Sequence, residues 1–74
     1  MKHRVAAELV GNVAQVMVAA GDEVGPTEAL VIMESMKMEI PVLAEVSGVV
    51  DEVAVAPGDV ITEGDTIAVI ETAG

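Results

Sequence analysis

Residues 11–22 read GNVAQVMVAAGD, and residues 48–59 read GVVDEVAVAPGD. The two stretches are copies of one unit set 37 positions apart, and the same offset aligns the rest of the chain without a gap: Val5 meets Val42 and Glu34 meets Glu71. An internal repeat of this length indicates two copies of one supersecondary unit that stack on each other. We therefore predict one domain over residues 1–74, built from repeat units 1–37 and 38–74.

The unit is predicted to be made of strands. The chain has fifteen valines and five isoleucines, and β-branched residues favour strands. Turn signals at Gly21-Asp22 and at Pro57-Gly58-Asp59 separate the apolar stretches. We expect Val13, Val16 and Val18 to share a strand, and Val50, Val53 and Val55 to share its copy. Leu30 and Ile32 are expected to alternate in the next strand, repeated by Ile67 and Val69. Four strands a unit give an all-β, flattened barrel or sandwich with pseudo-twofold symmetry.

One segment permits a second interpretation. Residues 28–39 are rich in good helix formers, Thr27 is a possible cap and Pro41 a possible stop, so the segment alone favours helix and strand about equally. The repeat favours the strand, because residues 29–34 align with TIAVIE at 66–71. An extended stretch from Ala29 to Val46 is too long for one strand and must reverse. Its most polar part predicts a hairpin tip at Met36-Lys37, although no Gly or Asn lies there to ease the turn.

Composition excludes several classes of function. The chain of 74 residues has a net charge of -10, no Cys and no aromatic residue. The charge opposes binding to nucleic acid or anionic membranes, and base stacking lacks its usual side chains. No Cys-based metal site or disulfide is possible, and no apolar run is long enough to span a bilayer. We expect a cytoplasmic protein that is a monomer in isolation, with no catalytic residue and no metal.

Lys37 is the candidate functional residue. It is one of two lysines in the chain, the other being Lys2 near the N-terminus, which we expect to be frayed. Met36 and Met38 flank it at a position where solvent normally favours polar residues, which suggests a surface that another protein reads. An ordinary surface lysine, with the two methionines partly buried against the barrel end, is the alternative.

The tip sequence Glu34-Ser35-Met36-Lys37-Met38 resembles the Glu-Ala-Met-Lys-Met signature of biotinyl domains, the biotin carboxyl carrier family. The resemblance covers nearly the whole chain and implies a barrel of two four-stranded antiparallel sheets. It implies covalent biotin on Lys37, with Met36 and Met38 beside it. Our own hypothesis is that Glu34, Ser35 and Glu39 are partner-recognition residues, with the two carboxylates pairing with basic residues of the partner. Lipoyl domains resemble this fold but usually carry Asp-Lys-Ala at the tip, so a lipoyl carrier and an unmodified interaction module stay as alternatives.

The resemblance also implies the partners. A biotin protein ligase would supply biotinyl-adenylate, and biotin carboxylase and carboxyltransferase subunits of an acyl-CoA carboxylase or a related enzyme would use the carrier. A lysine amine is protonated at neutral pH, and the chain offers no base, so we expect the ligase to deprotonate it. Met1 before the first strand favours a stand-alone carrier, and an excised domain would look the same.

Two departures from the family pattern concern turns. Thr27 stands where the second unit has Gly64, so we expect the first-half turn to differ in shape. Nothing between Val16 and Val24 resembles the protruding thumb of some carriers, which indicates the thumbless type. The remaining acids are expected to be solvated turn and edge residues, and His3 is expected to lie in a mobile end without a metal or catalytic role.

Overall fold

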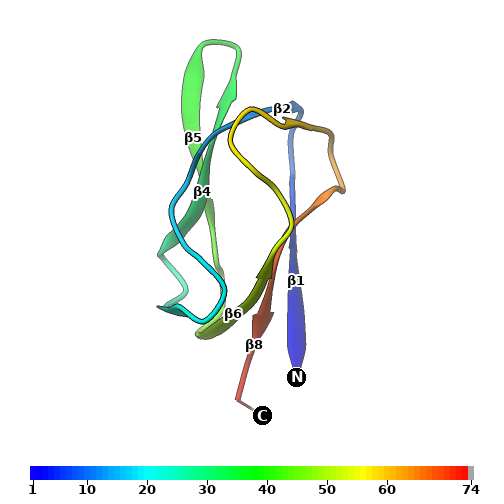
Figure 1. Cartoon of the computed structure of the whole chain (residues 1–74). Coiled ribbons are helices and arrows are strands. Elements are labelled where there is room, and N and C mark those ends of the chain that lie inside the picture. Colours follow the sequence, from blue (N-terminus) through cyan, green and yellow to red (C-terminus); the bar gives the residue numbers. More distant parts are fainter. Residues whose placement is uncertain (74) are drawn as a thin grey trace.

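The computed structural model describes residues 1–73 and contains eight strands. Figure 1 shows how they follow one another along the chain. Their bounds are β1 Lys2–Ala6, β2 Gly11–Val16, β3 Glu23–Val24, β4 Ala29–Ser35, β5 Met38–Leu43, β6 Gly48–Val53, β7 Val60–Ile61 and β8 Thr66–Glu71. The stretch at 29–35 that permitted a helix is therefore a strand, as the repeat predicted.

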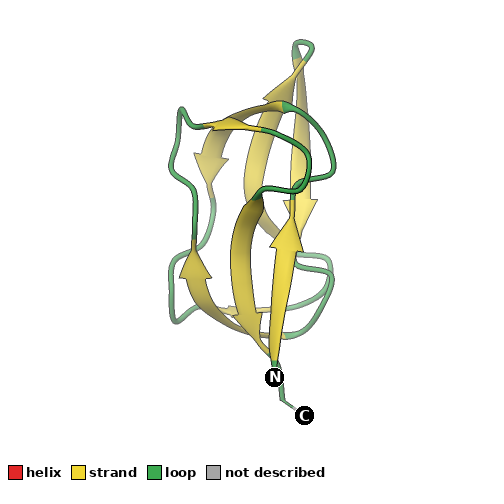
Figure 2. Ribbon diagram, turned by 90° about the vertical axis from the view of Figure 1, so that its right-hand side faces the viewer, coloured by secondary structure: helices red, strands yellow, loops and turns green. Residues whose placement is uncertain are grey.

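The strands form two antiparallel sheets that face each other. One has the order β1-β8-β6-β3 and the other the order β5-β4-β2-β7. Each strand of the first sheet has its repeat mate at the same position in the second sheet. This is the pseudo-twofold symmetry that the repeat predicted. Figure 2 shows the resulting flattened barrel, with one hairpin standing beyond its upper end. The predicted all-β fold is confirmed.

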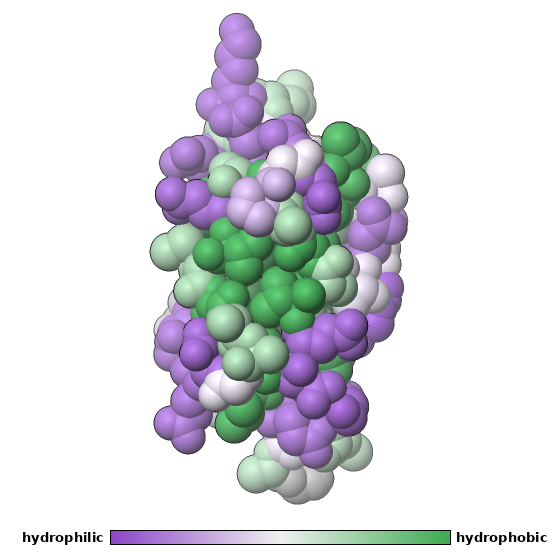
Figure 3. Space-filling view, viewed as in Figure 1, coloured by the Kyte–Doolittle hydropathy of each residue, from purple (hydrophilic) through white to green (hydrophobic). Residues whose placement is uncertain are grey.

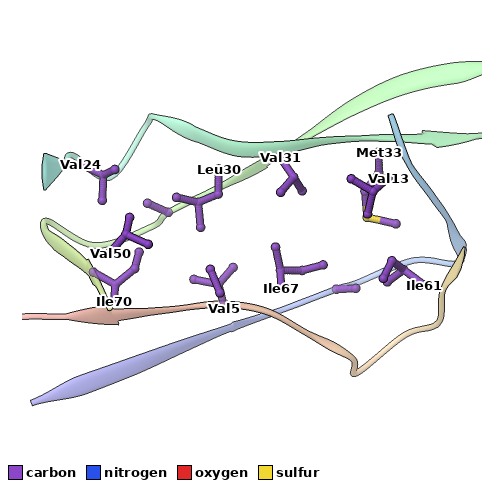
Figure 4. Packing of buried hydrophobic residues seen from close by; sticks show 13 residues of the cluster. Val5, Val13, Val24, Leu30, Val31, Met33, Val50, Ile61, Ile67 and Ile70 are labelled. Carbon is purple, nitrogen blue, oxygen red and sulfur yellow. The ribbon is translucent and has the colours of Figure 1, made fainter. Parts of the chain in front are cut away.

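Apolar side chains from both sheets fill the space between them. Figure 4 shows Val13, Met33 and Ile61 at one end of this core and Val24, Val50 and Ile70 at the other. Leu30, Met33, Ile67 and Ile70 are fully buried. Each sheet thus presents one face to the core and one to solvent, as expected of an antiparallel sheet.

The predicted alternation in β4 was wrong by one residue. Leu30 is buried as expected, but Val31 and Met33 are the next core residues, and Ile32 is half-buried. The cause is a bulge: Ala29 pairs with Leu43 and Val31 with Val42, so Leu30 has no partner on β5. Because a bulge adds one residue, it moves the following side chains to the opposite face. Ile67 repeats the bulge in β8, and Val69 is half-buried like Ile32. Val18 and Val55, predicted within strands, lie just beyond β2 and β6.

The N-terminal end is ordered, so the prediction of a frayed end was wrong. β1 begins at Lys2 and pairs with β8. The Met1 amine donates to Glu71 Oε1 over 3.2 Å, and Lys2 Nζ donates to Asp51 Oδ2 over 2.7 Å. The start of β1 and the end of β8 lie at the end of the barrel away from the hairpin (Figure 2). The molecule is 37 Å long and about half as wide. Residues 1–73 contain no helix of the length and apolarity that crossing a bilayer takes.

Acidic side chains close the turns, as the sequence predicted for several of them. Asp22 and Asp59, which are repeat mates, each accept from a backbone N–H three residues earlier over 2.9 Å. Asp65 does the same toward Thr62. In the first unit Glu28 replaces Asp65 and accepts from Gly25. Gly64 has a φ of +93° in its turn, whereas its mate Thr27 has no positive φ, so the two turns do differ in shape.

Candidate functional site

The site is a two-residue hairpin turn formed by Met36 and Lys37. β4 ends at Ser35, β5 begins at Met38, and these two residues form the last cross-strand pair. Met36 has a φ of 53° and Lys37 a φ of 66°. Positive φ at both central residues defines a type I′ turn, whose twist matches that of the two strands. The predicted tip position is therefore correct.

This turn is built from residues that do not favour it. Type I′ turns prefer Asn-Gly because other residues in the left-handed region cost about 1 kcal/mol each. Neither Met36 nor Lys37 offsets that cost by burial, since both are exposed and Met36 is 92% exposed. A local rule broken without a compensating contact is expected where a residue has another task.

Two contacts at the base hold the hairpin against the barrel. Ser35 Oγ donates to the Val10 carbonyl over 2.7 Å, which ties β4 to the loop before β2. Gly11 follows Val10, and a Cβ on it would lie 2.5 Å from the Glu34 carbonyl oxygen and 3.2 Å from Ser35 Cβ. The close approach of β2 to β4 at this level therefore needs glycine. The sequence pattern did not mark Val10 and Gly11 as supporting residues, although Gly48 repeats Gly11.

The Lys37 side chain is free of neighbours. It is exposed, and within residues 1–73 no hydrogen bond or ion pair involves its ammonium group. Hydrophilic atoms stand out beyond the body of the molecule at this end in Figure 3. The flanking Met38 is 64% exposed. The alternative in which Met36 and Met38 are partly buried against the barrel end is therefore wrong, and three adjacent side chains are open to a visiting molecule.

Glu34 and Glu39 face each other one step below the turn. They form the cross-strand pair next to Ser35 and Met38, and both are exposed. Their neighbours Met33 and Ile40 point to the interior, so the two carboxylates lie on the outer face of the sheet. Like charges directly opposite each other destabilise a strand pair. The hairpin therefore carries an uncompensated negative pair beside its only cation.

The other candidate groups do not gather into a reactive centre. Within residues 1–73 no three His, Asp or Glu side chains are placed to hold a metal ion. His3 lies in β1 opposite Ile70, not in a mobile end, and its Nε2 is buried without a hydrogen-bond partner. An apolar groove lies between the edge strands β1 and β5. Its lining includes Val5, Leu9, Met33 and Val42, and also the acidic residues Glu8 and Glu45. None of these groups lies at the hairpin tip.

The fold and the tip together define a class of protein. A symmetric β scaffold with an exposed amine that has no ion-pair partner within residues 1–73 is suited to carrying a covalent group on that amine. Residues 4–71 match the family model described as "Biotin-requiring enzyme". The chain belongs to this biotin/lipoyl family.

Its relatives include small proteins of nearly the same length. It is 65% identical over 71 residues to a "Biotinylated protein TB7.3 homolog" of Mycolicibacterium smegmatis, covering 96% of this chain and 100% of the relative. A protein of the same description from Mycobacterium leprae is 56% identical over 70 residues, covering 95% and 99%. A "Biotin/lipoyl attachment protein" of Bacillus subtilis is 44% identical over 63 residues, covering 85% and 86%.

Solved structures of large carboxylases contain a similar unit. The Kluyveromyces lactis urea carboxylase matches with a TM-score of 0.90 and 32% identity over 96% of this chain. A single-chain, multi-domain long-chain acyl-CoA carboxylase matches with a TM-score of 0.85 and 31% identity over 92% of this chain. The match spans only 6% and 7% of those two chains, so the likeness concerns one small unit within each of them.

Proposed function

We propose that the chain is a biotin acceptor and carboxyl carrier, with Lys37 as the residue that receives biotin. The observation that supports this proposal most strongly is the exposed, unpaired Lys37 on a two-residue turn at the end of the barrel. The domain is non-catalytic: it presents the amine, and enzymes that bind the tip act on it. The family match and the biotinylated relatives support this function.

The acylation step assigns separate tasks to the domain and to its ligase. The Lys37 amine attacks the acyl carbon of biotinyl-adenylate, an amide forms, and AMP leaves. The ammonium must first lose a proton, because only the neutral amine has the electron pair that attacks. Glu34 and Glu39 are exposed, and within residues 1–73 neither carboxylate is hydrogen-bonded or ion-paired to the Lys37 ammonium, so neither is placed to accept its proton. The ligase must therefore supply the base, and we expect no rapid self-labelling of Lys37 by biotinyl-adenylate.

After acylation Lys37 carries no charge and becomes part of a long, flexible arm. The biotin ring then holds the carboxyl group that a biotin carboxylase adds and a carboxyltransferase removes, so the cofactor supplies the chemistry and the protein supplies delivery. The tip lies at the opposite end of a 37 Å molecule from the start of β1 and the end of β8. This separation leaves the tip accessible whether the carrier acts alone or is joined to another chain. Cytoplasmic location and a monomeric state belong to the same proposal.

Recognition of the tip is assigned to the residues around Lys37. Met36 and Met38 offer exposed, adaptable apolar surface, and Glu34 and Glu39 offer two carboxylates to basic residues of the ligase. Ser35 acts through position, since its hydroxyl ties the hairpin to Val10. Glu34→Lys should slow biotinylation without unfolding the domain. Glu71→Lys, the same change at the repeat mate on the other sheet, should leave the ligase rate unchanged. Equal rates for Glu34→Lys and wild type would reject this role.

The acceptor assignment is tested by co-expression with a biotin protein ligase and biotin, followed by an avidin blot. Wild type and Lys2→Ala should both be labelled, and Lys37→Ala should not. Lys2→Ala is a matched control because it removes the other lysine, which is held by Asp51. Labelling of Lys37→Ala would refute the assignment. Modification of Lys37 by lipoate in place of biotin would favour the lipoyl-type carrier.

A further inference from the structure

The repeat allows each feature of the hairpin end to be compared with its mate at the terminal end. The sheet that contains the hairpin has the strand order β5-β4-β2-β7. On its outer face, one exposed residue from each of these strands lies in a single row across the sheet. Strand pairing joins Glu39 to Glu34, Glu34 to Asn12, and Asn12 to Val60. We call these four residues the tip row. In Figure 3 hydrophilic side chains lie at both ends of the molecule, above and below an apolar area.

The mates of these residues form an equivalent row on the other sheet, near the termini. Strand pairing joins Lys2 to Glu71, Glu71 to Val49, and Val49 to Glu23. We call these four residues the terminal row. The two rows have the same backbone setting, so a difference between them does not come from the fold. The terminal row therefore serves as an internal control for the tip row.

The first cross-strand pair of the terminal row, Lys2 and Glu71, has opposite charges, whereas the equivalent pair of the tip row has two negative charges. Glu71 accepts from the Met1 amine over 3.2 Å and lies opposite Lys2. Its mate Glu34 lies opposite Glu39, and neither carboxylate has an ion-pair partner within residues 1–73. A partner with basic side chains complements this pair.

The two rows also differ in the apolar side chain that each exposes. Val60, at the edge of the tip row, is 78% exposed, and its mate in the terminal row is Glu23. The terminal row has its one apolar residue, Val49, in an inner strand, where it is 41% exposed. An edge strand normally carries a charged residue such as Glu23, so an exposed valine at that position needs another reason.

We infer that the tip row is a docking strip for the biotin protein ligase, with basic ligase residues over Glu34 and Glu39 and an apolar ligase residue over Val60. The inference rests on the proposed function. The tip row lies next to the Lys37 turn on one face of the sheet, so the tip row and the turn form one continuous surface. Val60 lies roughly 14 Å from the turn, estimated from about 7 Å along the strands and about 12 Å across them. An interface of about 800 Å² a side, centred on the tip, has a radius of about 16 Å and covers it.

The length of the reacting side chain favours the ligase over the carboxylase as the occupant. The unmodified Lys37 is a four-carbon stem, so the ligase active site must come into contact with the turn to reach its amine. A carboxylase acts on a ring at the end of a much longer arm. It does not need close contact with the second cross-strand pair or with β7.

The test exchanges one pair of repeat mates. The double variant Val60→Glu/Glu23→Val has the composition and net charge of wild type but moves the exposed valine to the terminal end. Glu23→Val alone is the matched control, since it adds surface valine and leaves the tip row intact. The apo domain is titrated against ligase to obtain KM and kcat, and circular dichroism melting reports folding.

We expect the double variant to raise KM about tenfold with kcat unchanged, and Glu23→Val to match wild type. Val60→Thr, which keeps the shape of valine, replaces Val60→Glu if the latter lowers the melting temperature. A KM equal to that of wild type for the folded variants would overturn the inference, as would a loss confined to the carboxylase reaction. Loss of labelling in Lys37→Ala is measured separately. The docking role of the tip row can therefore be refuted while Lys37 remains the acceptor.

Discussion

Met36→Asn should make the folded domain more stable. Met36 has a φ of 53° at the first central position of a type I′ turn, and its side chain is 92% exposed. Replacing it therefore loses almost no buried surface. Asn tolerates the left-handed region that costs methionine about 1 kcal/mol, and it is the residue that type I′ turns prefer. We expect the free energy of unfolding to rise by about 0.5–1 kcal/mol, which for a domain of this size raises Tm by about 4 °C.

Far-ultraviolet circular dichroism is the suitable assay, because the chain has no Trp or Tyr for fluorescence. Unfolding in urea gives the free energy, and a thermal melt gives Tm. Met38→Asn is the matched control: Met38 is also exposed, at 64%, but lies in β5 without a positive φ. Asn is disfavoured in strands, so this variant should be neutral or less stable by up to about 1 kcal/mol.

A Met36→Asn variant no more stable than wild type would refute the argument that the turn is strained by its residues. The same variant should be a poorer ligase substrate, since it removes an exposed thioether next to Lys37. Higher stability with a lower kcat/KM is the combination expected where a turn keeps unfavourable residues for recognition.

Three further changes test the support of the site. Gly11→Ala should destabilise the domain by about 1–3 kcal/mol in urea unfolding, because its Cβ would lie 2.5 Å from the Glu34 carbonyl oxygen; an unchanged midpoint would show that β2 and β4 separate easily. Ser35→Ala should cost about 0.5–1.5 kcal/mol and speed amide exchange in the hairpin while keeping biotinylation, because it removes the 2.7 Å hydrogen bond to Val10; unchanged exchange would argue against that tie. The hydrogen bond and charge of Asp51 raise the pKa of Lys2 above its ordinary value of 10.5. The stabilisation from this ion pair is therefore complete below pH 10.5 and is lost as pH rises through the raised pKa. Lys2→Met should lose less stability than wild type across that pH range, and an identical loss would exclude the ion pair as its source.

The repeat carried most of the fold prediction. The helix formers at 28–39 supported two assignments, and only the alignment with residues 66–71 favoured the strand that β4 forms. The bulge at Leu30 was not predicted, because no residue type marks it and it appears only in the pairing with β5. Since one extra residue reverses the alternation, Ile32 and Val69 were placed on the wrong face.

Errors at the N-terminus have a similar cause. A short charged start reads as a frayed end, but Lys2 and His3 are held by β8, which comes from the far end of the chain. The tip itself was predictable from local polarity and from the absence of any better turn. Val60 was not, because only the strand pairing brings it into one row with Glu34. Comparing repeat mates in the sequence, Val60 with Glu23, is the signal that identifies it.

Intact-mass and fragment-ion spectrometry of the protein co-expressed with ligase and biotin shows whether Lys37 is the biotin acceptor. One added biotinyl group, located on Lys37, is expected in wild type and in Lys2→Ala, and none in Lys37→Arg. A biotinyl group on any other residue, or an unmodified Lys37 in a folded protein with active ligase, would contradict it.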